Sequence, residues 1–145
     1  MHPKDFFTPE QKAQIEAAIC EAEKLTSGEI RLHIDRTCKG DVLNEAITVF
    51  TKLNMHKTEL RNGVLFYLSI EDHKFAVIGD KGINETVPEG FWDCIYRQIV
   101  DYFKQEKYTE GLCWAILEAG KQLVAHFPIA HDDTDELTNE ISFEK

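Results

Sequence analysis

Oxygen-bearing side chains gather in two segments that are each expected to follow a β-strand. Asp35 ends the first strand and Asp41 closes the loop behind it, while Asp80, Asn84 and Glu85 follow a later strand. Carboxylate and amide oxygens are the hard ligands that calcium and magnesium prefer. Ligands of open α/β sheets collect at the carboxyl ends of strands. If the two loops meet, these five residues are predicted to bind a divalent metal ion, with calcium expected first and magnesium or zinc as alternatives.

Several of these residues also have a purely structural interpretation. Asp41 precedes an amphipathic segment and can serve as a helix N-cap. The sequence Asp80-Lys81-Gly82 is equally typical of a turn. His33 could join a zinc site from the polar face of its strand, although such a histidine is more often a hydrogen-bonded surface residue.

Motifs of known hydrolases are missing from the sequence. The chain contains no G-x-S-x-G elbow and no phosphate-binding P-loop. The segment Asp35-Arg36-Thr37 lacks the second aspartate of a D-x-D pair. Cleavage of a phosphate would therefore have to follow a metal-assisted route, and the sequence assigns no catalytic residue.

Hydrophobic periodicity predicts the elements that position the two loops. Thr8-Pro9-Glu10-Gln11 supplies an N-cap, a proline at the first helical position and a capping-box glutamine, which together mark a helix start. The expected helices are 9–26, 42–53, 88–103 and 110–127, and the expected strands are 29–35, 64–68 and 75–78, with 141–143 as a C-terminal edge strand. The order αβαββαα is typical of a three-layer α/β/α sandwich around a mixed, roughly four-stranded sheet.

Three elements carry specific burial expectations. Residues 29–35 alternate strictly, so His33 and Asp35 are predicted on a face that is wet or lines a polar site. The continuous apolar run 64–68 is predicted at the centre of the sheet, buried on both sides. The helix 42–53 is predicted to bury the stripe Leu43, Ala46, Ile47, Phe50 and Leu53.

The bulk composition excludes several classes of protein. A chain of 145 residues is the size of one domain, predicted to span 1–145 with an acidic arm at 129–145. The net charge of −10 argues against nucleic acid and anionic membranes as partners, since both attract cationic surfaces. The N-terminus does not look like a signal peptide, and no apolar run is long enough to span a bilayer. A cytoplasmic location with free cysteine thiols is therefore expected.

Four segments together resemble the TPM domain. They are Thr26-Ser27-Gly28-Glu29-Ile30, Arg61-Asn62-Gly63-Val64-Leu65-Phe66, Ile78-Gly79-Asp80-Lys81-Gly82-Ile83-Asn84 and Tyr108-Thr109-Glu110-Gly111-Leu112. The resemblance covers nearly the whole chain, and the Asn-Gly-Val-Leu strand and the glycine loop after its hairpin are its specific parts. The absence of a transmembrane tail makes the chain similar to the stand-alone bacterial branch of that family.

This resemblance implies an α/β/α sandwich and the binding of a divalent metal ion. The acidic loop pair and the missing catalytic motifs favour a regulatory or interaction module in which the ion orders the loops at the sheet's carboxyl edge, with an unidentified protein as a further partner. A plant member of the family is described as an acid phosphatase, so the alternative is a metal-dependent phosphatase acting on phosphomonoesters.

Overall fold

The centre of the computed structural model is a sheet of four strands in the order β3-β2-β1-β4. The structure describes residues 2–129 and 140–144. The strands are β1 (Glu29–Asp35), β2 (Gly63–Ser69), β3 (Lys74–Gly79) and β4 (Ser142–Phe143). The helices are α1 (Pro9–Glu23), α2 (Val42–Lys52), α3 (Lys81–Asn84), α4 (Phe91–Lys104) and α5 (Tyr108–His126), with short 3₁₀ helices η1 (Pro3–Asp5) and η2 (Met55–Lys57).

The strand directions define two distinct ends of the sheet. β1 runs parallel to β2 and to β4, and its last residue Asp35 lies opposite Ser69, the last residue of β2. β3 runs antiparallel to β2, so that its last residue Gly79 lies opposite Val64 near the start of β2. The predicted mixed sheet is thereby confirmed, including the C-terminal edge strand.

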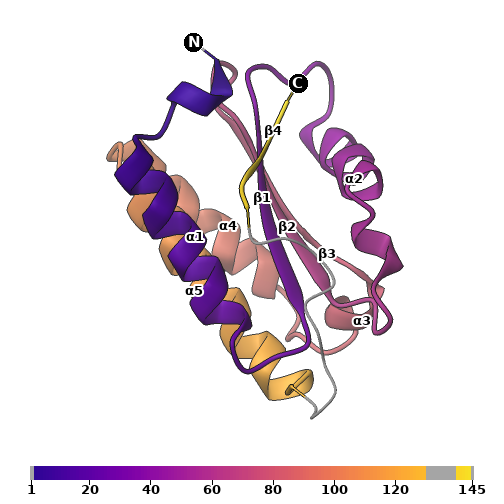
Figure 1. The fold of residues 1–145 in the computed structure, drawn as a ribbon. Helices are drawn as coiled ribbons and strands as arrows, with labels where there is room; N and C mark the ends of the chain where they lie inside the picture. The colour runs from indigo at the N-terminus through magenta and orange to yellow at the C-terminus, as the bar shows by residue number, and fades with distance from the viewer. Residues whose placement is uncertain (1, 130–139, 145) are drawn as a thin grey trace.

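Helices cover both faces of the sheet, which makes the predicted three-layer sandwich (Figure 1). α1, α4 and α5 pack on one face over the larger apolar core, whereas α2 covers the other face over a smaller cluster around Leu65 and Tyr67. A Cβ placed on Gly120 would lie 2.7 Å from the Ala22 Cβ, so the close packing of α5 on α1 requires glycine there. The run of β2 is buried throughout, as its continuous apolar sequence predicts.

The start of α1 follows from its capping residues. Thr8 accepts a hydrogen bond from the Gln11 backbone N–H at 3.1 Å, and the Gln11 side chain accepts one from the Thr8 N–H at 2.9 Å. This is the predicted capping box.

One burial expectation is decided and another is wrong in part. Of the two alternatives for the polar side of β1, a wet face is excluded, since Glu29, His33 and Asp35 are 2%, 8% and 9% exposed, and His33 and Asp35 line a polar cavity instead. In α2, Leu43 and Ile47 are 51% and 54% exposed, and the buried residues are Ala46, Val49 and Phe50. None of α1, α4 and α5 lies on the face that α2 covers, so only a narrow strip of its apolar surface is buried.

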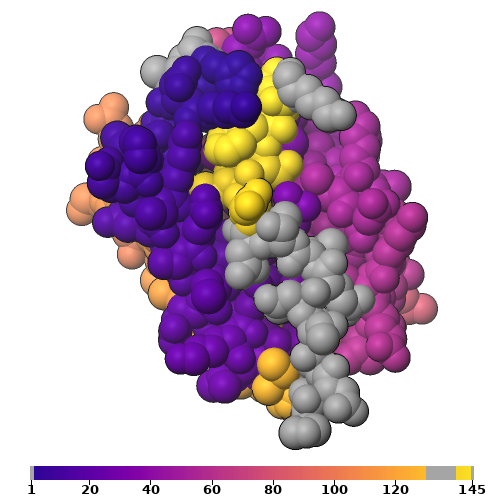
Figure 2. Space-filling model, viewed as in Figure 1, coloured from indigo at the N-terminus to yellow at the C-terminus, as the bar shows by residue number. Residues whose placement is uncertain are grey.

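The C-terminal residues 140–144 fill the gap between the N-terminal helices and α2 (Figure 2). Phe143 lies under the Lys12 ammonium, whose Nζ is 5.5 Å from the ring centre. Residues 130–139 of the predicted acidic arm lie outside the described part of the chain. Within that part, no helix has the length and apolar character needed to cross a membrane.

Candidate functional site

A chain of polar side chains spans three strands at the end of β1. Asp35 Oδ1 lies 2.6 Å from His33 Nε2, and Asp35 Oδ2 accepts a hydrogen bond from the Tyr67 hydroxyl at 2.7 Å. The other ring nitrogen, His33 Nδ1, lies 2.8 Å from Ser142 Oγ. The register explains the cluster, because His33 is the direct neighbour of Tyr67 on β2 and of Ser142 on β4.

The hydrogen bonds decide the charge of this cluster. Burial alone raises the pKa of Asp35, but the hydrogen bonds from His33 and Tyr67, with the positive charges of His33 and Lys52, outweigh it and lower the pKa. Burial, followed by the hydrogen bond to Asp35, raises the pKa of Tyr67. The cluster at neutral pH therefore contains a buried carboxylate that is ionised and a phenol that stays protonated.

Asp35 opens into a cavity of about 700 Å³ between β1, β4 and α2. We call it the acidic cavity, and its lining includes His33, Asp35, Glu45, Lys52, Ser142 and Glu144. Three of these residues are acidic and one is a lysine. The excess of negative charge in a partly enclosed space favours cationic ligands.

Three segments that are distant in sequence are tied together beside this cavity. The backbone N–H of Arg36 donates to Glu144 Oε1, and the N–H of Cys38 donates to Asp72 Oδ2. The Lys74 ammonium donates to the carbonyl of Gly40 at 3.0 Å. The loop 36–41 is thus anchored to the β2–β3 turn and to the C-terminal segment, so a change at one of the three reaches the others.

The sheet register separates the two predicted metal loops. The backbone N–H of Asp80 donates to the Gly63 carbonyl at the start of β2, whereas Asp35 lies beside Ser69 at its end. The length of β2 puts about 20 Å between these two positions. The expected meeting of the loops is therefore contradicted, because β3 returns antiparallel and delivers its carboxyl end to the opposite end of the sheet.

At that opposite end, the predicted ligands hold the chain together. Arg61 donates to both Asp80 oxygens at 2.7 and 2.8 Å, and the Lys81 N–H donates to Asp80 Oδ1 at 2.8 Å. Asn84 donates to the Gly79 carbonyl and accepts from Trp92 Nε1, both at 2.8 Å. A metal ion here would have to displace the Arg61 guanidinium, so the donor set fits a cation poorly. Glu85 is exposed at the end of α3.

Asp41 lies at the same end of the sheet as Asp35 and caps α2. Its Oδ2 accepts a hydrogen bond from the Asn44 N–H at 3.0 Å. Among residues 2–129 and 140–144, no three His, Cys, Asp or Glu side chains come together as a group that could hold a metal ion. The acidic cavity therefore offers suitable donor atoms for a hard cation without a preassembled coordination shell.

The sequence prediction missed Tyr67, Ser142, Glu45 and Glu144. Tyr67 was hidden inside an apolar run, where its hydroxyl is the sole polar feature. The hydrogen-bonded series Ser142, His33 and Asp35 has the residue types of the nucleophile, base and orienting carboxylate of some hydrolases. Ser142 and His33 are also direct cross-strand neighbours, so the pairing of β4 with β1 already accounts for their contact without a catalytic role.

Comparisons with known proteins agree with this fold. The family model of the TPM domain matches residues 1–122. The NMR structure of the BA42 protein from the psychrophilic bacterium Bizionia argentinensis has 45% sequence identity and a TM-score of 0.89, with 97% of each chain covered. No curated protein matches the sequence.

Two more distant structures share the fold alone. An N-terminal domain from P. gingivalis has 15% identity and a TM-score of 0.70, covering 88% of this chain and 84% of that one. The N-terminal domain of the cg2496 protein from Corynebacterium glutamicum has 13% identity and a TM-score of 0.64, covering 81% of this chain and 74% of that one.

Proposed function

The chain belongs to the TPM domain family, and from that premise we propose that it is a divalent-cation-binding module whose ion binds in the acidic cavity. The observation that carries the proposal is the ionised carboxylate of Asp35, which is 9% exposed and opens into a cavity with two further acidic residues. Calcium is the first candidate because carboxylate oxygens in an adaptable arrangement suit its loose coordination. Magnesium and zinc are the alternatives.

Binding would require movement of side chains around Asp35. Glu45 is half-buried on α2 and Glu144 follows β4, and both can turn toward Asp35 without moving the sheet. Of the residues predicted from the sequence, Asp35 remains the central ligand and Asp41 a neighbour in the same loop. Asp80, Asn84 and Glu85 belong to the opposite end and are left out of the proposed site.

The consequence of binding would be a fixed arrangement of three segments. The loop 36–41, the β2–β3 turn and residues 142–144 are already linked through backbone N–H groups and carboxylates. An ion held by Asp35 and Glu144 would reinforce this link and stabilise the folded chain. The resulting surface is the region where we propose that a protein partner is recognised, which makes the module regulatory rather than catalytic.

The test is a calcium titration of the chelator-treated protein, followed by backbone amide NMR shifts. We expect saturable shifts in residues 35–45 and 140–144. Glu45→Gln removes one ligand charge and should weaken the affinity about tenfold. Glu85→Gln is the matched control, since it makes the same change on an exposed residue at the other end of the sheet, and it should leave the affinity unchanged.

Two outcomes would contradict the proposal. If Glu85→Gln weakens binding and Glu45→Gln does not, the ion binds at the β3 end of the sheet. If calcium, magnesium and zinc all leave the amide shifts unchanged, the chain is not a cation-binding module. No contact in the described residues favours a phosphatase specifically, so that alternative rests on the family resemblance alone.

A further inference from the structure

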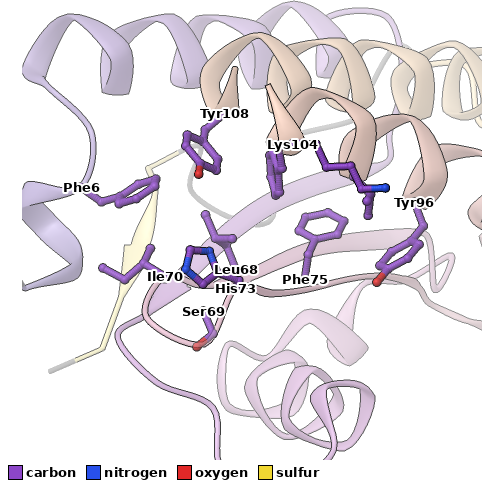
Figure 3. A pocket seen from close by; sticks show the side chains of 11 residues that line it. Phe6, Leu68, Ser69, Ile70, His73, Phe75, Tyr96, Lys104 and Tyr108 are labelled. Carbon is purple, nitrogen blue, oxygen red and sulfur yellow. The ribbon is translucent and has the colours of Figure 1, made fainter. Parts of the chain in front are cut away.

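A second cavity lies at the same end of the sheet on the opposite face. It measures about 280 Å³ and is enclosed by the α4–α5 corner, the β2–β3 turn and the N-terminal segment. Figure 3 shows Tyr96, Lys104 and Tyr108 reaching it from the helices, and Leu68, His73 and Phe75 reaching it from the sheet side. Its size is close to the lower limit of about 300 Å³ for small-molecule sites. We call it the aromatic cavity.

Aromatic rings form most of its wall. Phe75 lies 5.6 Å from Phe103 and 6.1 Å from Tyr96 between ring centres, and Tyr108 lies 5.1 Å from Phe103 and 5.2 Å from Phe6. The five rings come from the N-terminal segment, β3, α4 and α5. Rings fixed against one another from separate elements form a rigid apolar surface, which suits a flat apolar ligand.

The charged residue that lines this cavity is Lys104, with His73 as a second basic side chain. None of the aspartates and glutamates among the described residues lines it, although the whole chain carries a net charge of −10. Within the described residues, neither the His73 side chain nor the Lys104 side chain has a hydrogen bond or an ion pair. The Tyr96 and Tyr108 hydroxyls at the same wall are also available as donors. The free polar groups therefore match an anion rather than a cation.

From these observations we propose that the aromatic cavity binds a small aromatic carboxylate, with the ring against Phe75 and Phe103 and the carboxylate near Lys104. The site is separate from the acidic cavity and does not depend on the cation. An uncharged ligand of the same shape would lose the charge-assisted contacts, and a cation would find no partner.

The experiment compares phenylacetate with its neutral analogue phenylacetamide by backbone amide NMR of the full chain. Phenylacetate should cause saturable shifts in residues 68–75, 96–104 and 108, without shifts in residues 35–45. Phenylacetamide should bind about tenfold more weakly. Lys104→Gln should weaken phenylacetate about tenfold.

Lys57→Gln is the matched control, because it removes a charge from an exposed lysine outside the cavity and should leave binding unchanged. The proposal is overturned if phenylacetate causes no saturable shift, or if Lys104→Gln and Lys57→Gln bind it equally. It is also overturned if the same amides shift with protein concentration alone, since the cavity would then be covered by a second copy of the chain.

Discussion

The acidic and aromatic cavities lie on opposite faces of one end of the same sheet, yet they have opposite charge. The acidic cavity contains Asp35, Glu45 and Glu144, whereas the ionisable residues of the aromatic cavity other than tyrosine are His73 and Lys104. Asp35 and Ser69 are register partners, so the two cavities begin at neighbouring backbone positions.

The β2–β3 turn shows how so small a region keeps the two sets of charges apart. Asp72 turns toward the α2 side and accepts a hydrogen bond from the Cys38 N–H, whereas the next residue, His73, lines the aromatic cavity. Both residues lie in the turn, where His73 has a left-handed φ of +53°. A tight turn at the end of a sheet can therefore present consecutive side chains to its two faces.

The two cavities also differ in the interactions that stabilise their walls, which are aromatic packing around Phe75 and hydrogen bonds around Asp35. Phe75 is 5% exposed and packs against Phe66, Tyr96 and Phe103. Phe75→Ala should lower the free energy of unfolding by about 4 kcal/mol, because it removes a buried ring and leaves a void. Urea denaturation measures the loss. Phe75→Leu refills part of the volume and should recover most of it; equal losses would mean that packing does not support this wall.

The wall of the acidic cavity should instead depend on hydrogen bonds. Asp35→Ala leaves the His33 ring and the buried Tyr67 hydroxyl without their acceptor, and should cost about 3 kcal/mol in urea denaturation. Asp41→Ala removes an exposed N-cap from α2 and should cost about 1 kcal/mol. If the two substitutions lower the stability equally, the hydrogen bonds to Asp35 do not stabilise this wall more than an exposed N-cap does. The proposed difference between the two cavity walls would then be wrong.

Local sequence patterns were enough to predict the layers and most of the sheet. The capping box at Thr8, the apolar run of β2 and the edge strand near Ser142 were all recognisable in this way. The separation of the two acidic loops also follows from the sequence, since a hairpin reverses the chain and sends the end of β3 away from Asp35. The prediction that these loops meet applied the rule for parallel strands to an antiparallel one.

The composition of the site was harder to predict because it depends on pairing between distant segments. Ser142 contacts His33 across 109 positions of sequence, and nothing near Ser142 specifies which strand it will join. Likewise, the hydroxyl of Tyr67 finds its hydrogen-bond acceptor only because the register places it beside Asp35. Periodicity identifies the faces of a strand but not its partners.

The last prediction concerns pH and distinguishes the two walls most directly. The pKa of Asp35 is lowered from its ordinary value of 3.8 in the folded chain, so its ionised form stabilises the fold above the unfolded pKa. This stabilisation is lost as the pH falls through the folded pKa. Tyr67→Phe removes one hydrogen bond to the carboxylate, and should therefore cost about 2 kcal/mol near pH 7 and clearly less near pH 3.

Urea denaturation of both proteins across this pH range measures the difference. Phe75→Leu is the control from the other face, because it changes packing and touches no carboxylate, and its cost should stay constant from about pH 6 to about pH 3. If the cost of Tyr67→Phe is equally constant, Asp35 is not the titrating acceptor of the Tyr67 hydroxyl. The stabilisation of the acidic wall would then come from packing, as on the aromatic side, and the physical distinction between the two cavities would reduce to their charge alone.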